Sequence, residues 1–105
     1  SSTTFEPDRP VTREQIAAIF YRYAQSNGFD VTVSDEDISS AIGGYNGFED
    51  ISDYAKIPVA WCFNKNIMSI YSLNGYEYEI YPKAAPTRAE TATMFSKLSY
   101  ELNNN

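Results

Sequence analysis

Apolar residues recur every three or four positions near both ends of the chain, a spacing typical of amphipathic helices. The first such stretch, residues 12 to 26, carries an apolar stripe made of Ile16, Ile19, Phe20 and Tyr23. The second runs from residue 87 to about residue 100 and on toward the end of the chain, with a stripe made of Ala92, Phe95, Leu98 and Leu102. We predict a helix over each stretch, with both stripes facing the core.

Both predicted helices begin with the same polar signal. Residues 12 to 15 read Thr-Arg-Glu-Gln, and residues 87 to 90 read Thr-Arg-Ala-Glu. In such a capping box the threonine hydroxyl accepts a hydrogen bond from the third helical amide, while the Gln or Glu side chain accepts one from the threonine amide. The pattern therefore predicts a helix start at Thr12 and another at Thr87.

The two helices are copies of one unit. An offset of 75 residues aligns Pro7, Thr12, Arg13, Ala17 and Phe20 with Pro82, Thr87, Arg88, Ala92 and Phe95. Five identities within 14 positions indicate an internal repeat. We therefore expect Phe20 and Phe95 to occupy equivalent positions in the core.

A loop and a third helix separate the copies. Residues 29 to 47 are rich in glycine and polar residues, with at most a short helix begun at Ser34. Residues 53 to 66 form the third helical stretch. Its regular part should run from about Ile57 to residue 66, because Pro58 is tolerated only in a first helical turn.

The segment from Ser69 to Tyr81 changes its apolar period to two around Asn74-Gly75, which predicts a β-hairpin. Its tyrosines face one side and are expected to pack within the hairpin, although a phenol face also suits a sugar ring. Glu77 and Glu79 share the other side, but a hairpin offers no cleft to separate their pKa values, so we do not interpret them as a glycosidase pair.

The composition narrows the function. The 105 residues include 14 acidic and 8 basic side chains, for a formal net charge of −6, and no histidine. An acidic chain without a basic cluster is repelled by nucleic acid and by anionic lipid, and no apolar run has the length of a membrane span. Without histidine, the commonest general base and zinc ligand are missing. Most hydrolase mechanisms are thereby excluded, and we expect neither a metal nor a cofactor.

Two further features are not interpreted as metal or catalytic sites. The cluster Asp35-Glu36-Asp37 lacks the glycine and the glutamate that an EF-hand loop counted from Asp35 requires, so it is interpreted as a solvated turn. Cys62, the only cysteine, lies between Trp61 and Phe63 and is expected to be a small buried apolar residue.

An ordered series of motifs resembles the S-layer homology (SLH) domain family. The series consists of Phe48-Glu49-Asp50-Ile51, Tyr54-Ala55, Trp61, Ile67, Ile80-Tyr81-Pro82 and Thr87-Arg88-Ala89-Glu90. The fold implied is mainly α, with SLH-like helix-loop-helix repeats and a small β-hairpin insertion. The implied organisation is the second half of a repeat at 1–28, a linker loop at 29–47, a complete repeat at 48–102 and a disordered tail at 103–105. The chain itself, which starts without methionine, is expected to be a piece of a longer protein.

The resemblance implies a noncatalytic module at the bacterial cell surface that binds secondary cell-wall polysaccharide, in many members through pyruvylated sugars, and so anchors a larger secreted protein. Further SLH repeats are its expected partners, in cis or in trans. Two glycines of the family's Gly-Ile-x-x-Gly loop are replaced by Asn66 and Ser69. This departure favours the alternative, a degenerate repeat that serves as a protein-interaction or spacer domain.

Five residues are candidates for ligand binding: Arg13, Arg88, Glu90, Asp50 and Trp61. The two arginines occupy the first helical position, where the helix macrodipole disfavours a cation. They either form a fork for a carboxylate such as a pyruvyl ketal, or pair internally with Glu49 or Asp50 or pack between repeats. Trp61 is either a core anchor or part of a ligand groove.

Overall fold

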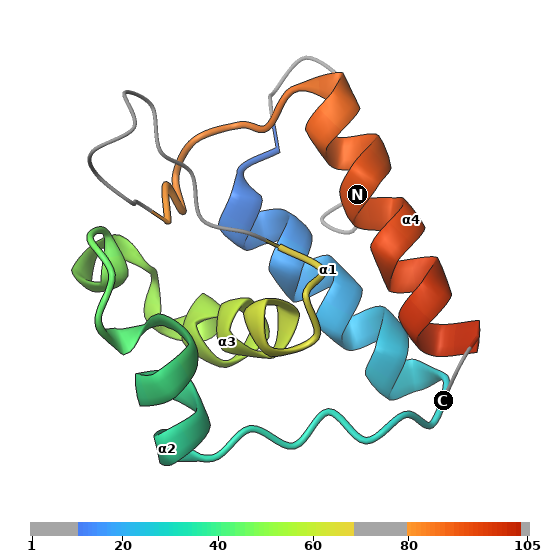
Figure 1. Ribbon diagram of the computed structural model, residues 1–105, viewed down its shortest axis with the longest axis horizontal. Helices are drawn as coiled ribbons and strands as arrows, with labels where there is room; N and C mark the ends of the chain where they lie inside the picture. Colours follow the sequence, from blue (N-terminus) through green and yellow to red (C-terminus); the bar gives the residue numbers. More distant parts are fainter. Residues whose placement is uncertain (1–10, 69–79, 104–105) are drawn as a thin grey trace, which may run out of the picture.

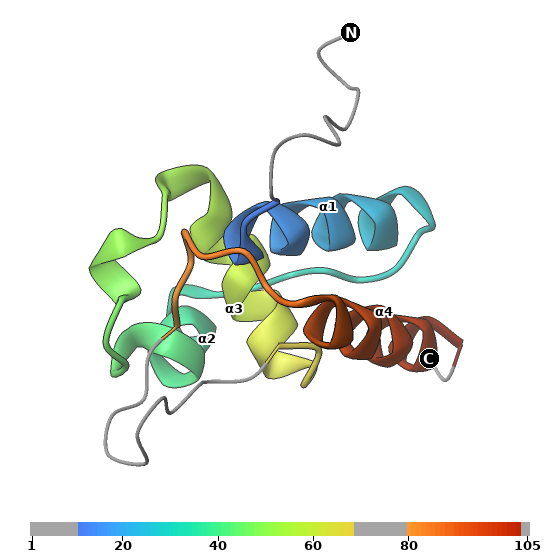
Figure 2. The ribbon, with the colours of Figure 1, turned by 90° about the horizontal axis from the view of Figure 1, so that it is seen from above.

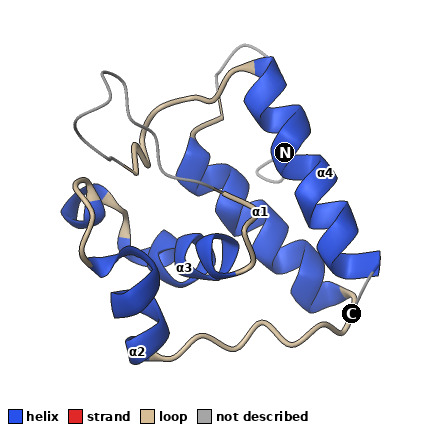
Figure 3. Cartoon of the chain, in the orientation of Figure 1, coloured by secondary structure: helices blue, strands red, loops and turns tan. Residues whose placement is uncertain are grey.

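The computed structural model describes residues 11–68 and 80–103, which form a mainly helical fold (Figure 1). The described residues contain helices and loops and no strand (Figure 3). The predicted hairpin turn at Asn74-Gly75 lies outside the described residues. Along those that are described, no helix combines the length and the apolar character needed to cross a membrane.

Helix α1 spans Arg13–Ser26 and α4 spans Arg88–Asn103, and both start where their capping boxes predict. The Thr12 hydroxyl accepts from the Gln15 amide at 3.3 Å, and the Gln15 side chain accepts from the Thr12 amide at 2.9 Å. In α4 the corresponding Thr87 and Glu90 bonds measure 3.1 and 2.7 Å. Both predicted helix starts are therefore confirmed.

The first two amides of α1 are satisfied from far along the chain. The Arg13 amide donates to the Ala84 carbonyl at 2.9 Å, and the Glu14 amide donates to the Pro82 carbonyl at 3.0 Å. The Arg13 side chain adds a bond from Nε to the Ile80 carbonyl at 3.1 Å. Since amides at a helix start lack partners within the helix, segment 80–84 completes the N-terminal cap of α1.

Helix α3, Lys56–Asn64, lies at the centre and packs against α1, with Pro58 in its first turn as predicted. The predicted end at residue 66 is two residues too late. Asn66 has a φ of 60°, the Asn66 amide donates to Phe63 and the Ile67 amide donates to Cys62. This pair of bonds around a left-handed residue is a Schellman motif, which terminates the helix before Asn66.

Shorter helical pieces connect α1 to α3. The short helix α2, Asp35–Ile38, is capped by Ser34 as predicted. A π-helical turn (η1, Ser39–Gly43) and two 3-10 turns (η2, Phe48–Asp50, and η3, Asp53–Ala55) follow. These pieces close the side of the core away from α4 (Figure 2).

The core gathers around α3. The buried residues of α3 include Val59, Trp61 and Cys62, and α1 packs on them through Ile16, Ala17, Phe20 and Ala24. The Trp61 ring meets Tyr21 edge-on at 6.0 Å. Burial raises the pKa of the Cys62 thiol, which keeps it protonated and unreactive, in agreement with its predicted role as a small apolar residue.

Part of each predicted apolar stripe lies outside the core. Helices α1 and α4 run side by side in the same direction (Figures 1 and 2), and Phe20 meets Phe95 at 4.8 Å between ring centroids. Phe20 is buried, whereas Phe95 is 55% exposed, so the expectation of equivalent core positions is wrong for Phe95. Ile19 and Tyr23 are also more than half exposed. The reason is that α1 buries only one side of its stripe in the core, through Ile16, Ala17, Phe20 and Ala24, so Ile19 and Tyr23 are left at the margin.

Candidate functional site

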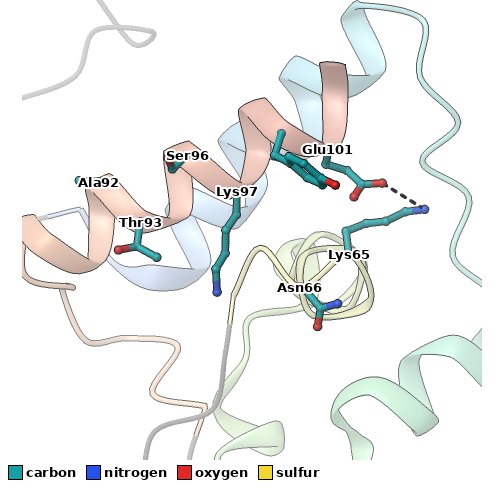
Figure 4. A pocket seen from close by; sticks show the side chains of 8 residues that line it. Lys65, Asn66, Ala92, Thr93, Ser96, Lys97 and Glu101 are labelled. Carbon is teal, nitrogen blue, oxygen red and sulfur yellow. Dashed lines mark ion pairs between the residues drawn. The ribbon is translucent and has the colours of Figure 1, made fainter. Parts of the chain in front are cut away.

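A groove runs along α4 where this helix faces the end of α3. Its main cavity has a volume of about 660 Å³ and is lined by Lys65, Asn66, Thr93, Ser96, Lys97 and Tyr100, among others (Figure 4). A second cavity of about 240 Å³ continues it toward the start of α4 and shares Thr93 and Lys97 with the first. We refer to these two cavities together as the α4 groove.

Lys97 is the central cation of the α4 groove. Its side chain extends from α4 toward the turn that carries Asn66 (Figure 4). Within the described part of the chain Lys97 has no hydrogen-bond or ion-pair partner. Lys65, by contrast, pairs with Glu101 at 3.8 Å. The main cavity also contains the Glu101 carboxylate, but that group pairs with Lys65, so the Lys97 ammonium is the group there that suits an anionic ligand.

Asn66 shapes the wall opposite Lys97. Its left-handed backbone follows from the Schellman motif at the end of α3. Glycine is the usual residue in this conformation, and asparagine is among the few others that tolerate it. The turn at this position is therefore compatible with asparagine as well as with glycine. Unlike glycine, Asn66 also presents a carboxamide to the groove.

The five candidate ligand residues fall in different places. Arg13 and Glu90, 77 positions apart in sequence, both line the smaller cavity of the α4 groove, although Arg13 is 98% buried and Glu90 also caps α4. Arg88 and Asp50 are exposed and line neither cavity of the α4 groove. Trp61 is 2% exposed and belongs to the core.

The structure distinguishes the two roles expected for Arg13 and Arg88, a fork for a carboxylate ligand and an internal contact. The Arg13 guanidinium is buried and bonded to the Ile80 carbonyl, so its observed role is packing between α1 and segment 80–84. No ion pair joins Arg88 to Glu49 or Asp50 among the described residues. The internal pairing is therefore absent for Arg88, whose guanidinium faces solvent at the start of α4.

Glu14 is a buried carboxylate that accepts four hydrogen bonds, and it was not among the candidates. Its carboxylate is 3% exposed and accepts from the Ser52 amide at 2.9 Å, the Ser52 hydroxyl at 2.7 Å, the Tyr54 hydroxyl at 3.3 Å and Lys83 Nζ at 3.1 Å. Burial acts to raise the pKa of Glu14, but the hydrogen bonds from Ser52 and Lys83 outweigh it and hold the pKa below its ordinary value. The same carboxylate, with burial, raises the pKa of Tyr54.

This cluster is structural and does not have the chemistry of a Ser–Lys nucleophile. Lys83 Nζ also contacts the Ser52 hydroxyl, but its side chain is 59% exposed and paired with a carboxylate. A Ser–Lys dyad instead has its lysine buried, where desolvation makes the amine a base. The signal available in the sequence was the lone acid in the first turn of α1, which the macrodipole favours.

No metal centre emerges from the described residues, in which no group of three or more Asp, Glu and Cys side chains is placed to hold an ion. Comparisons with protein-family models, with curated proteins and with solved structures found no match to this chain.

Proposed function

We propose that this chain is a noncatalytic module that binds an acidic cell-wall polysaccharide and anchors a larger protein at the bacterial surface. The α4 groove is the proposed binding site. The observation that carries the proposal is Lys97, a cation without a described partner in the main cavity of a chain whose net charge is −6. Because the chain as a whole is acidic, an ammonium without a described partner in a cavity is a favourable place for a carboxylate-bearing sugar.

The other groups of the groove suit a sugar. Thr93 and Ser96 offer hydroxyls, and Asn66 offers an amide that both donates and accepts. Tyr100 presents a largely exposed ring, and an aromatic face buries the apolar side of a pyranose. The groove thus combines two lysines, one of them paired with Glu101, with several neutral polar groups and one aromatic ring, and such a set is suited to an acidic sugar unit.

The resemblance to SLH domains also supports a module that binds cell-wall polysaccharide. Both capping boxes of the Thr-Arg motif form as helix starts, and the turn at Asn66 keeps a backbone that glycine favours. On this proposal the chain comprises helix-loop-helix repeats with a hairpin insertion, and the protein is extracellular. Pyruvylated wall polymer is then the expected ligand class.

Sedimentation with purified bacterial cell walls tests the proposal, before and after chemical removal of the pyruvyl groups. We expect Lys97→Gln to lower the wall-bound fraction, with an affinity loss of about five- to tenfold because one charge-assisted contact disappears. Arg22→Gln is the matched control, since it removes one exposed cation from α1. Equal losses in the two variants would show a general charge effect and exclude the groove.

Arg88 provides an independent arm of the same experiment. If the Arg88 guanidinium donates two parallel hydrogen bonds to a carboxylate of the ligand, Arg88→Lys weakens wall binding although the charge is kept. The reason is that an ammonium lacks the two parallel donors. Unchanged binding by Arg88→Lys together with a loss in Lys97→Gln would place the ligand in the α4 groove and away from the start of the helix.

A protein-interaction role is the second candidate, and one observation favours it. A groove of about 460 Å³ between α1 and α4 is lined by the exposed apolar residues Ile19, Tyr23 and Phe95. Exposed apolar patches of this kind mark contact surfaces. If the wild-type protein sediments neither with untreated walls nor with walls that lack pyruvyl groups, the protein-interaction role is favoured.

A further inference from the structure

Three Asn-Gly pairs occur in the sequence, and the structure describes two of them, Asn27-Gly28 and Asn46-Gly47. Asparagine is among the thermally labile residues of proteins. When glycine follows, no Cβ hinders the approach of the glycine amide nitrogen to the asparagine carboxamide, so the two groups can close into a succinimide ring. The sequence makes both pairs candidates for this reaction, and the fold then determines which of them is free to react.

The end of α1 holds both reacting groups of the first pair. The Asn27 side chain donates from Nδ2 to the Tyr23 carbonyl at 2.8 Å. The Gly28 amide donates to the Gln25 carbonyl at 3.1 Å, as part of the hydrogen-bonded turn that terminates the helix. Ring closure would require the carboxamide to leave Tyr23 and the amide to leave Gln25. The helix end therefore opposes the reaction at Asn27.

The reacting groups of the second pair are not held in this way. Asn46 and Gly47 lie between η1 and η2, and Asn46 is exposed. Among the described residues, the Asn46 side chain has no hydrogen-bond partner and the Gly47 amide donates to no acceptor. Exposure does not distinguish the two pairs, because Asn27 is exposed as well. The difference between them is the hydrogen bonding of the carboxamide and of the glycine amide.

We propose that Asn46-Gly47 is a site of spontaneous deamidation and that the end of α1 protects Asn27-Gly28 from the same reaction. Hydroxide removes the proton of the Gly47 amide, and the nitrogen attacks Asn46 Cγ. The N–Cγ bond forms, the Cγ–Nδ2 bond breaks, and the leaving nitrogen takes a proton from water and departs as ammonia. Water then opens the succinimide. Cleavage at the side-chain carbonyl gives aspartate, and cleavage at the main-chain carbonyl gives isoaspartate.

The isoaspartate product alters a contact between distant parts of the chain. The Asn46 carbonyl accepts from the Ile80 amide at 3.1 Å, at the start of segment 80–84, which caps α1. In isoaspartate this carbonyl becomes part of a carboxylate branch, and the main chain gains a methylene group. The acceptor is thereby displaced from the Ile80 amide. Each conversion also adds one negative charge to a chain whose formal net charge is −6.

Peptide mapping of the wild-type protein tests the proposal, after incubation in mildly alkaline buffer below the unfolding temperature. Mass spectrometry locates each converted asparagine, and chromatography separates isoaspartyl from aspartyl peptides. In the folded protein we expect Asn46 to convert at least about tenfold faster than Asn27, because two hydrogen bonds must first open at Asn27. In protein unfolded by guanidinium chloride the two rates should be similar, since neither pair is then held.

Equal rates at Asn46 and Asn27 in the folded protein, or an Asn46 that stays intact, would overturn the proposal. A difference that persists in guanidinium chloride would overturn it too, because the contrast would then come from neighbouring side chains and not from the fold. Anion exchange separates the isoaspartate form of Asn46 from the unmodified protein by its added charge. Its Tm should be lower, and equal Tm values would refute the lost contact with Ile80.

Discussion

Replacing Glu14 by glutamine tests how much of the stability depends on one buried carboxylate. The change keeps the size of the side chain but removes its charge and leaves it one acceptor oxygen in place of two. At 3% exposure, this group joins the start of α1 to Ser52 and Tyr54 on one side and to Lys83 on the other. The substitution therefore weakens the contacts of α1 with two other segments of the chain at once.

The expected loss follows from the partners. Hydrogen bonds to a charged group contribute about 1.5–3 kcal/mol each, and glutamine replaces only part of the two bonds from Ser52. The Lys83 ion pair adds less than about 1 kcal/mol, because the lysine is 59% exposed and water screens it. We expect Glu14→Gln to lower the free energy of unfolding by about 2–3 kcal/mol, which lowers Tm by about 10–20 °C in a domain of this size.

The pH dependence provides a second readout. The pKa of Glu14 is lower in the folded protein than in the unfolded chain, so its contribution is present above the unfolded pKa and is lost as the pH falls through the folded value. The stability gap between wild type and Glu14→Gln should therefore shrink as the pH falls below about 4.

Urea denaturation followed by circular dichroism measures both effects. Glu49→Gln, which neutralises an exposed glutamate in η2, is the matched control and should change the midpoint little. Equal midpoints for Glu14→Gln and Glu49→Gln at neutral pH would refute the reasoning, and so would a gap that stays constant down to acidic pH.

Two further substitution pairs test the fold. Phe20→Ala should cost about 3–5 kcal/mol, whereas Phe95→Ala should cost less than about 1.5 kcal/mol because its ring is half exposed; similar urea midpoints would contradict the observed burial. Asn66→Gly should change stability by less than about 0.5 kcal/mol, while Asn66→Val should destabilise by about 1–2 kcal/mol because a branched side chain clashes in the left-handed region. Thermal unfolding compares that pair, and equal Tm values would argue against the left-handed turn.

The helix starts were predictable because their causes are local. Thr12 and Thr87 bond residues three positions away, within reach of any short window of sequence. The buried face was less predictable, since Tyr23 and Phe95 belong to stripes wider than the contact that α1 makes with α3. Which part of a stripe is covered depends on the partner helix, and the spacing of apolar residues carries no information about it.

In the candidate site, too, the features that depend on distant residues could not be predicted from the sequence. The donors to Glu14 come from positions 38 to 69 residues away, so no local pattern relates them. Lys97 likewise gains significance only when the end of α3 places Asn66 opposite it. Arg13 became a candidate through its unfavourable position at a helix start, whereas the cavity that it shares with Glu90 results from the packing of α1 beside α4.

The cap that segment 80–84 supplies to α1 has a consequence for the order of folding. A nascent chain that has reached only residue 68 contains all of α1, α2 and α3, but not the carbonyls of Pro82 and Ala84 that accept from the first amides of α1. Closing a loop of some 70 residues must precede those bonds, and its entropy opposes early formation. The N-terminal turn of α1 should therefore be among the last parts to gain protection from hydrogen exchange during synthesis, although it lies in the first described helix.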